Sequence, residues 1–261
     1  MVASGAAFHS VRLIAMTFCL GIKVDQGLVA LADTQIVKGS ERLSKGKFTL
    51  LQHGDQRLFI MTSGLRSVRD KTVIYLEEKL REEEADFERL YQVAQAFGEQ
   101  LRRVKQEDGA ALAQGGLNFN LHAIIGGQLD QDPSPALFLI YPEGNWIEAS
   151  PDSSYFIIGR TLYGKPILDR LLGFQTPLPQ ALALAYLAFD ATRTSVVDVA
   201  FPIDVIVFDQ TTHLLYQERF DAPALANATE WWQQCLRTAL GKFPMDWANS
   251  LLANISSVKT N

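Results

Sequence analysis

The chain has few of the residues that build disulfide or metal-based scaffolds. Its 261 residues include only two cysteines, Cys19 and Cys235, and four histidines. Two widely separated cysteines exclude a disulfide framework, and the histidines show no metal-ligand spacing. The histidines are His9, His53, His122 and His213. We therefore expect no metal site and no cofactor.

An excess of basic residues and long apolar runs are also lacking. The 24 Lys and Arg residues against 29 Asp and Glu residues give a net charge of −5, which argues against a nucleic-acid-binding surface. No apolar run reaches the ~18 residues that a membrane helix needs. With 48% hydrophobic residues, the chain can nevertheless bury one sizeable core. We expect one core domain, without a nucleic acid or membrane partner.

The most informative stretch is the apolar, strand-forming run that begins at Thr17, directly after Met16. If Thr17 is the mature N-terminus, its hydroxyl can attack a carbonyl while its own α-amino group takes the proton. The unperturbed pKa of that amine is about 7.7–8.0, so much of it can be the neutral base near pH 7. Residues 1–15 are then a short propeptide or, as we prefer, a mis-called start. A Met-Thr start lets ordinary aminopeptidase chemistry expose Thr17.

Three further polar or small residues stand at the ends of predicted strands. A turn at residues 25–27 joins two apolar strands, and the second of these ends at Asp33. Lys47 directly precedes the apolar run that starts at Phe48, and Gly64 follows a strand over residues 57–62. Active-site groups are commonly carried at such ends.

This arrangement resembles the proteasome-type N-terminal nucleophile hydrolases, the β-subunit family, and among them the bacterial Anbu (ancestral β-subunit) branch. An acidic residue sixteen positions after the threonine matches the first hairpin of the family. The most specific match lies within residues 158–170, which contain the unusual run Tyr-Gly-Lys-Pro-Ile-Leu-Asp. Further matching segments are residues 124–128, 139–149 and 202–205.

The resemblance implies a catalytic role for each strand-end residue. Thr17 would be nucleophile and base, and Lys47 would lower the pKa of the nucleophile. Asp33 would hold that lysine charged and in place, and the Gly64 N–H would form the oxyanion hole. Alone, each of the last three is typical of a turn or a solvated surface, but their joint spacing favours the functional reading. Lys45 is the alternative lysine if the register is shifted.

The chain departs from the pattern of proteasome β-subunits at two further positions. Proteasome β-subunits carry a serine just after the glycine that corresponds to Gly159, whereas this chain has Arg160. The second acidic residue of the proteasome site falls near Ser195, where no carboxylate is aligned, although Asp198 is close. Two alternatives to a threonine-type hydrolase therefore stay open. One is an assembly or scaffold protein with weak or no catalysis, and the other is an N-terminal nucleophile amidase acting on a small molecule.

Periodicity predicts an α+β fold, a four-layer αββα sandwich like that of proteasome β-subunits. We expect residues 16–220 to form this domain, and residues 221–261 to add a C-terminal helical extension of it. The extension carries Trp231-Trp232 and Trp247, which are either packed on the outer layer or part of a contact between subunits. We expect two long helices within 65–107 and further helices at 163–173 and 177–192, with a flexible connection at 109–118. The later strands are expected at 119–128, 136–141, 145–149, 154–158, 202–209 and 213–219.

As a whole, the resemblance implies a cytoplasmic bacterial threonine-type endopeptidase or amide hydrolase. It also implies a homo-oligomeric ring or spiral without a separate α-type ring, acting on a peptide or amide substrate and needing no cofactor.

Overall fold

The computed structural model of the chain describes residues 17–38, 41–44, 46–53, 56–81 and 87–258. The predictions for residues 1–15 and for Lys45 therefore lie outside the described residues. The chain divides into two compact units, one ending at Phe220 and one beginning at Asp221.

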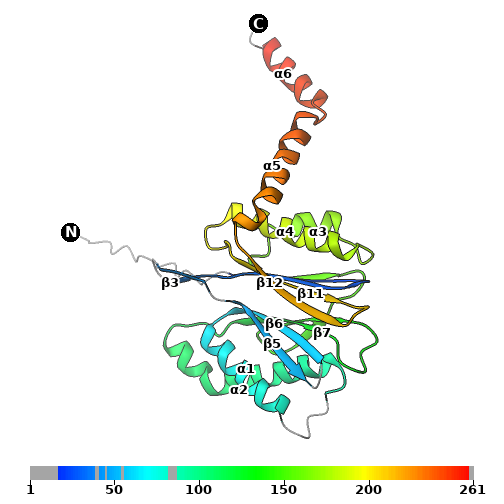
Figure 1. Cartoon of the computed structure of the whole chain (residues 1–261). Coiled ribbons are helices and arrows are strands. Elements are labelled where there is room, and N and C mark those ends of the chain that lie inside the picture. The colour runs from blue at the N-terminus through cyan, green and yellow to red at the C-terminus, as the bar shows by residue number, and fades with distance from the viewer. Residues whose placement is uncertain (1–16, 39–40, 45, 54–55, 82–86, 259–261) are drawn as a thin grey trace, which may run out of the picture. The chain divides into compact units, whose positions relative to one another are not determined.

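Two five-stranded antiparallel sheets face each other in the first unit (Figure 1). The first sheet has the order β10-β1-β2-β11-β12 and the second has the order β5-β6-β7-β8-β9. The first contains β1 (Phe18–Val24), β2 (Gly27–Asp33), β10 (Tyr155–Gly159), β11 (Ile203–Asp209) and β12 (Leu214–Phe220). The second contains β5 (Phe48–His53), β6 (Gln56–Gly64), β7 (Leu121–Gly127), β8 (Ala136–Ile140) and β9 (Trp146–Glu148).

A pair of helices covers the outer face of each sheet (Figure 1). The helices α1 (Arg66–Arg81) and α2 (Leu90–Gln114) lie on the second sheet, and α3 (Lys165–Leu171) and α4 (Leu178–Ser195) lie on the first. The predicted α+β fold, a four-layer αββα sandwich, is therefore confirmed.

Apolar side chains between the layers explain why the strands read as almost continuous hydrophobic runs. Every residue of β2 is buried, because one face of this strand packs on α4 and the other faces the second sheet. The core between the sheets joins residues of β1 and β2, such as Cys19 and Leu28, to residues of β6 and β7, such as Phe59 and Ile124.

Two local predictions were wrong or incomplete. The connection expected at 109–118 is helical as far as Gln114, because Ala110, Ala111 and Ala113 favour helix strongly enough to offset Gly109. A short hairpin of β3 (Gln35–Lys38) and β4 (Glu41–Ser44), which forms its own two-stranded sheet, was not predicted.

The second unit is helical. It contains a 3₁₀ turn, η1 (Pro223–Leu225), followed by α5 (Ala226–Gly241) and α6 (Asp246–Val258). Apolar side chains of this unit are largely exposed, with Trp231 at 63% and Trp247 at 65% of full exposure. Within the described part of the chain, no helix is long and apolar enough to cross a membrane.

Helix α2 packs closely against the turn between β8 and β9. A Cβ atom on Gly98 of α2 would lie 2.1 Å from the carbonyl oxygen of Gly144, closer than any real contact. The Arg102 Nη1 donates to the same oxygen at 2.9 Å, and the Trp146 Nε1 donates to Gln95 Oε1 at 3.2 Å. The register of α2 on the second sheet therefore depends on the absence of a side chain at residue 98.

We expect Gly98→Ala to lower the free energy of unfolding by about 1–3 kcal/mol, because two backbones must move apart. Gly109→Ala is the matched control in the same helix. Its Cβ would meet only Lys105 Cγ at an ordinary 3.7 Å, and alanine favours helix by up to ~1 kcal/mol, so this variant should be more stable than wild type. Urea denaturation followed by circular dichroism measures both. Equal effects of the two changes would contradict the packing argument.

Candidate active site

The four residues predicted to carry catalysis all lie at strand ends on facing sheets. Thr17 directly precedes β1 and Asp33 ends β2 in the first sheet. Lys47 directly precedes β5 and Gly64 ends β6 in the second. Asp33 is fully buried, and Thr17 and Lys47 are each only 8% exposed.

The carboxylate of Asp33 joins the starts of two strands. Its Oδ1 accepts a hydrogen bond from Lys47 Nζ at 2.5 Å and another from the Phe18 backbone N–H at 2.8 Å. A buried charge needs both an opposite charge and hydrogen bonds, and Asp33 receives both through this one oxygen. The residue after Thr17 and the lysine before β5 are therefore held on the same carboxylate.

Burial raises the pKa of the Asp33 carboxyl, while the Lys47 ammonium and the backbone N–H groups of Phe18 and Gln35 oppose that shift. The opposing interactions all favour the charged form, so the ionised carboxylate depends on Lys47. Burial also raises the pKa of Cys19 to about 12, so this thiol stays protonated and is no competing nucleophile near neutral pH.

The end of β10 lies against the backbone of Thr17. Gly159 pairs with Phe18 in the sheet and has a φ of +88°, and a Cβ atom there would lie 1.7 Å from the Thr17 carbonyl oxygen. The Arg160 backbone N–H donates to that same oxygen at 2.7 Å. Only glycine fits at residue 159, because both the φ angle and the space exclude a side chain.

The side chain of Arg160 pairs with a buried carboxylate. Its Nε lies 3.3 Å from Asp198 Oδ1 and its Nη2 lies 2.9 Å from Asp198 Oδ2. Asp198 is 4% exposed and belongs to the loop between α4 and β11. In the sequence, Arg160 was only a residue that replaces a serine of proteasome β-subunits, and Asp198 was only a carboxylate close to the position where an acidic residue was expected. The structure joins the two in an ion pair, and the backbone N–H of Arg160 contacts Thr17.

A cavity of about 430 Å³ opens between Gly64 and Gly159. Its wall includes His122, one of the four histidines without metal-ligand spacing. Burial lowers the pKa of His122, so the neutral ring is favoured. Its position follows from the pairing of β7 with β6, which sets His122 opposite Ser63, and this pairing cannot be read from sequence alone. The other lining residues are Ser63, Asn120, Leu139, Tyr141, Ile157, Ile158 and Thr161.

Asn120 adds an acceptor to this wall. Its Oδ1 is buried and makes no hydrogen bond within the described residues, and its carbonyl oxygen accepts the Leu65 N–H at 3.0 Å. A ligand N–H group entering the cavity could therefore find a partner there.

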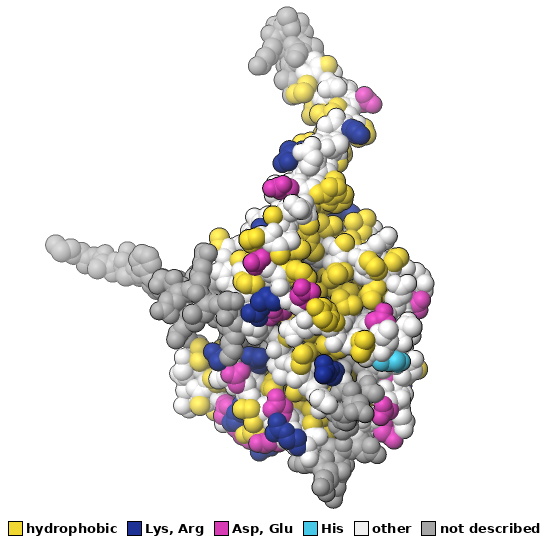
Figure 2. Space-filling model, viewed as in Figure 1, with side chains coloured by type: hydrophobic (Ala, Val, Ile, Leu, Met, Phe, Trp, Pro, Cys, Tyr) yellow, Lys and Arg dark blue, Asp and Glu magenta, His cyan; other side chains and the backbone are white. Residues whose placement is uncertain are grey.

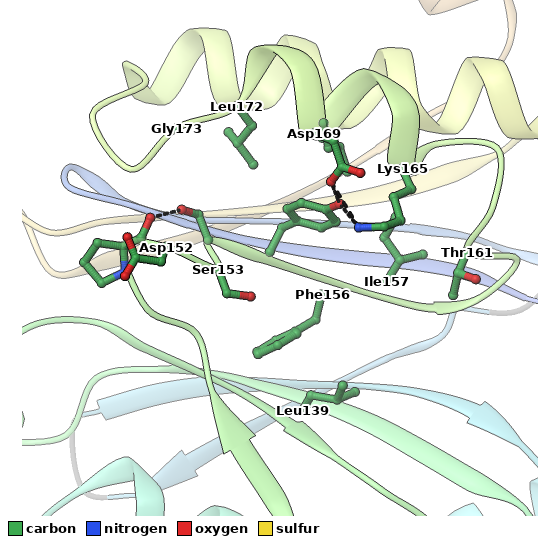
Figure 3. Close-up of a pocket in the computed structure, with 14 residues that line it drawn as sticks. Leu139, Asp152, Ser153, Phe156, Ile157, Thr161, Lys165, Asp169, Leu172 and Gly173 are labelled. Atoms are coloured by element: carbon green, nitrogen blue, oxygen red, sulfur yellow. Dashed lines mark hydrogen bonds and ion pairs between the residues drawn. The ribbon is translucent and has the colours of Figure 1, made fainter.

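A second cavity, of about 420 Å³, adjoins the first, because Leu139, Ile157 and Thr161 line both (Figure 3). Tyr155 lies in its wall and its hydroxyl hydrogen-bonds Asp169. Lys165 Nζ lies 3.0 Å from the Tyr155 hydroxyl oxygen and 3.1 Å from Asp169 Oδ1. Lys165 and Asp169 belong to the run Tyr-Gly-Lys-Pro-Ile-Leu-Asp, which carried the most specific resemblance. Through Tyr155 they connect α3 to β10.

Among the described residues, no three His, Cys, Asp or Glu side chains are grouped so that they could hold a metal ion.

The chain is similar to a protein family and to several solved structures. The family model for proteasome subunits matches residues 16–207. The solved structure of an Anbu (Gly-1) mutant from Hyphomicrobium sp. strain MC1 is 31% identical, with a TM-score of 0.78 over 87% of this chain and 98% of that chain. Anbu (ancestral beta-subunit) from Yersinia bercovieri is 29% identical, with the same TM-score and coverage. The helical assembly of the Anbu complex from Pseudomonas aeruginosa is 29% identical, with a TM-score of 0.81 over 87% of this chain and 97% of that chain. No curated protein sequence matches the chain.

We expect Lys47→Met to lower the free energy of unfolding by about 3–5 kcal/mol near neutral pH, because it leaves the Asp33 charge buried without its partner. The loss should shrink as the pH falls. Without Lys47 the pKa of Asp33 lies further above its unfolded value, so the folded state binds more protons than the unfolded state in the window between the two pKa values. Stability of the variant relative to wild type then rises as the pH falls through that window.

Urea denaturation at a series of pH values measures this effect. Lys45→Met is the matched control, two residues away, and should show no pH-dependent loss. A loss confined to Lys45→Met would mean that Lys45 is the partner of Asp33, and equal losses in the two variants would contradict a role specific to Lys47.

Proposed function

This chain is a member of the proteasome subunit family, and we propose that it is a threonine-type N-terminal nucleophile hydrolase that cleaves peptide or amide bonds. The observation that carries the proposal is the Asp33 carboxylate, which binds the Phe18 N–H directly after Thr17 and the ammonium of Lys47. The likeness to Anbu structures supports the same assignment.

The proposed reaction uses Thr17 as both nucleophile and base. The free α-amino group takes the hydroxyl proton while Oγ attacks the substrate carbonyl carbon. The resulting oxyanion is stabilised by the Gly64 N–H and by the fixed positive charge of Lys47, which acts more strongly in a buried site than in water. The intermediate then collapses to an ester on Thr17, and the protonated amine gives its proton to the leaving amine. Water hydrolyses the ester, which restores the Thr17 hydroxyl.

This mechanism requires a chain that begins at Thr17. We propose that removal of Met16 after initiation at that residue, or removal of residues 1–16 as a propeptide, exposes the amine. We further propose residues 16–220 as the catalytic domain and residues 221–261 as its helical extension.

The two adjoining cavities favour a peptide over a small amide as substrate. Each has the volume of an ordinary small-molecule pocket, and together they run from Gly64 and Gly159 along β10 to Tyr155. An extended chain would use the whole length, whereas a small amide would need only the first cavity.

An assembly role with weak catalysis is the second candidate, and it is favoured by one observation. Arg160 stands where proteasome β-subunits carry a serine, and its side chain is paired with Asp198.

Self-association is proposed because large apolar side chains are exposed on both units. On the first unit they include Leu214 and Tyr216 of β12, and Figure 2 shows apolar side chains gathered on the face over α4 and β12. On the second unit, Leu236 and Leu240 share one side of α5, and α6 adds Trp247. A second copy of the chain is the proposed cover for these surfaces, as either a closed ring or an open spiral.

Thr17→Ala should abolish covalent labelling by a β-lactone, because one hydroxyl carries the chemistry, while leaving the fold and assembly intact. Intact-mass analysis of wild type from its native host should show a mature chain that starts at Thr17 and gains one equivalent of the probe. Thr211→Ala, which removes an exposed hydroxyl near the turn before β12, is the control and should label like wild type. A mature chain that keeps residue 16, or a labelled Thr17→Ala, would refute the mechanism.

Wild type should be a homo-oligomer at micromolar concentration, and a chain truncated after Ala222 should form a smaller assembly. The reason is that α5 and α6 present apolar area that needs cover. Light scattering measures both. A monomeric wild type would contradict self-association, and an unchanged assembly after truncation would remove the second unit from the interface.

A further inference from the structure

We infer that Arg160 and Asp198 are positioning residues for Thr17, because their ion pair closes a ring of contacts around the backbone of the nucleophile. The inference rests on the proposed function of Thr17. It concerns Arg160, where proteasome β-subunits carry a serine, and Asp198, the carboxylate closest to the unmatched position near Ser195.

The first part of the ring is the contact of Gly159 and Arg160 with Thr17. The Arg160 N–H donates to the Thr17 carbonyl oxygen at 2.7 Å, and Gly159 lies so close to that carbonyl that no side chain fits. A movement of residues 159–160 therefore moves Thr17 with it.

The second part is the ion pair itself. Two of the three guanidinium nitrogens of Arg160, Nε and Nη2, donate to Asp198 at 3.3 and 2.9 Å, in a side-by-side geometry that fixes direction as well as distance. The side chain of Asp198 is 5% exposed and that of Arg160 is 28% exposed, so water screens the pair only in part. The pair thus links the end of β10 to the loop between α4 and β11.

The third part leads from that loop back to β1. Pro202, at the end of the loop, accepts two hydrogen bonds from Thr34 on its carbonyl oxygen. The Thr34 N–H lies at 3.0 Å and the Thr34 Oγ1 at 2.8 Å. Thr34 follows Asp33, whose carboxylate accepts the Phe18 N–H. The ring is then complete, because Phe18 follows Thr17.

Neighbouring contacts show why the ion pair is the part of the ring that can be tested. The other links are backbone hydrogen bonds, the Thr34 hydroxyl, whose acceptor also takes the Thr34 N–H, and Asp33, which has its own proposed role. Asp190 and Arg193 form a comparable pair with side chains 5% and 23% exposed, and both residues belong to α4, although Arg193 also lies 5.2 Å from the centre of the Phe201 ring. Asp190 is therefore a matched control in burial and chemistry.

A positioning role and a direct electrostatic role give different results. If the guanidinium acted on the Thr17 amine by its charge, Arg160→Met would raise the apparent pKa of the labelling profile and Asp198→Asn would lower it. If the pair positions Thr17, both changes slow labelling and leave that pKa in place, because neither alters Asp33 or Lys47.

The test measures the second-order rate constant for modification of Thr17 by a β-lactone, as a function of pH, on full-length protein whose mature N-terminus is checked by mass. We expect Arg160→Met and Asp198→Asn each to slow labelling by about tenfold or more, since a misplacement of about 1 Å at a reacting group can cost on the order of 100-fold. Asp190→Asn should stay within about twofold of wild type, and Arg160→Lys, which keeps the charge, should recover part of the loss. An unchanged rate in both variants, opposite shifts in pKa, or an equal loss in Asp190→Asn would overturn the inference.

Hydrogen exchange measured by mass spectrometry tests the same ring without catalysis. Peptides covering residues 155–162 should exchange faster in Arg160→Met and Asp198→Asn than in wild type or Asp190→Asn, because the Arg160 N–H is released from Thr17. Unchanged exchange would overturn the inference. A wild type that the β-lactone does not label would instead count against the proposed function, and the exchange result would still decide whether the ion pair holds Thr17.

Discussion

The rest of the site depends on one buried carboxylate. Asp33 lies in a layer that excludes water, so its charge persists only because Lys47 and backbone N–H groups surround it. These partners come from different sheets, and the pair therefore fixes the spacing of two layers as well as the electrostatics of a site. The same contact that makes Lys47 available as a fixed positive charge makes both residues hard to replace singly.

The layered fold accounts for how residues far apart in the chain meet at this carboxylate. Each of these residues stands at the end of a strand, and the apolar core between the facing sheets holds the strand ends of the two sheets close together. The proposed site is therefore assembled from short, separate segments. Two further segments complete it, since Gly159 and Arg160 contact Thr17 at the end of β10, and Asp198 pairs with Arg160 from the loop between α4 and β11.

Much of this architecture could be predicted from the sequence. The fold class followed from the order of apolar patterns, and Thr17, Asp33, Lys47 and Gly64 were predicted from their places at strand ends and from a family resemblance. Features that depend on tertiary pairing could not be predicted. His122 reaches the cavity only because β7 pairs with β6 in one register, and Asp198 meets Arg160 across a gap of 38 residues. The end of α2 was misplaced because Gly109 was weighted above the alanines that follow it.

The exposed apolar side chains of α5 and α6 affect what fraction of the chains is assembled. If a second copy covers them, association and stability become one equilibrium, and mass action makes that equilibrium depend on protomer concentration. Dilute chains would then carry bare tryptophan and leucine surface, and concentrated chains would bury it. The abundance of the protein would itself act as the signal that determines when the assembly exists.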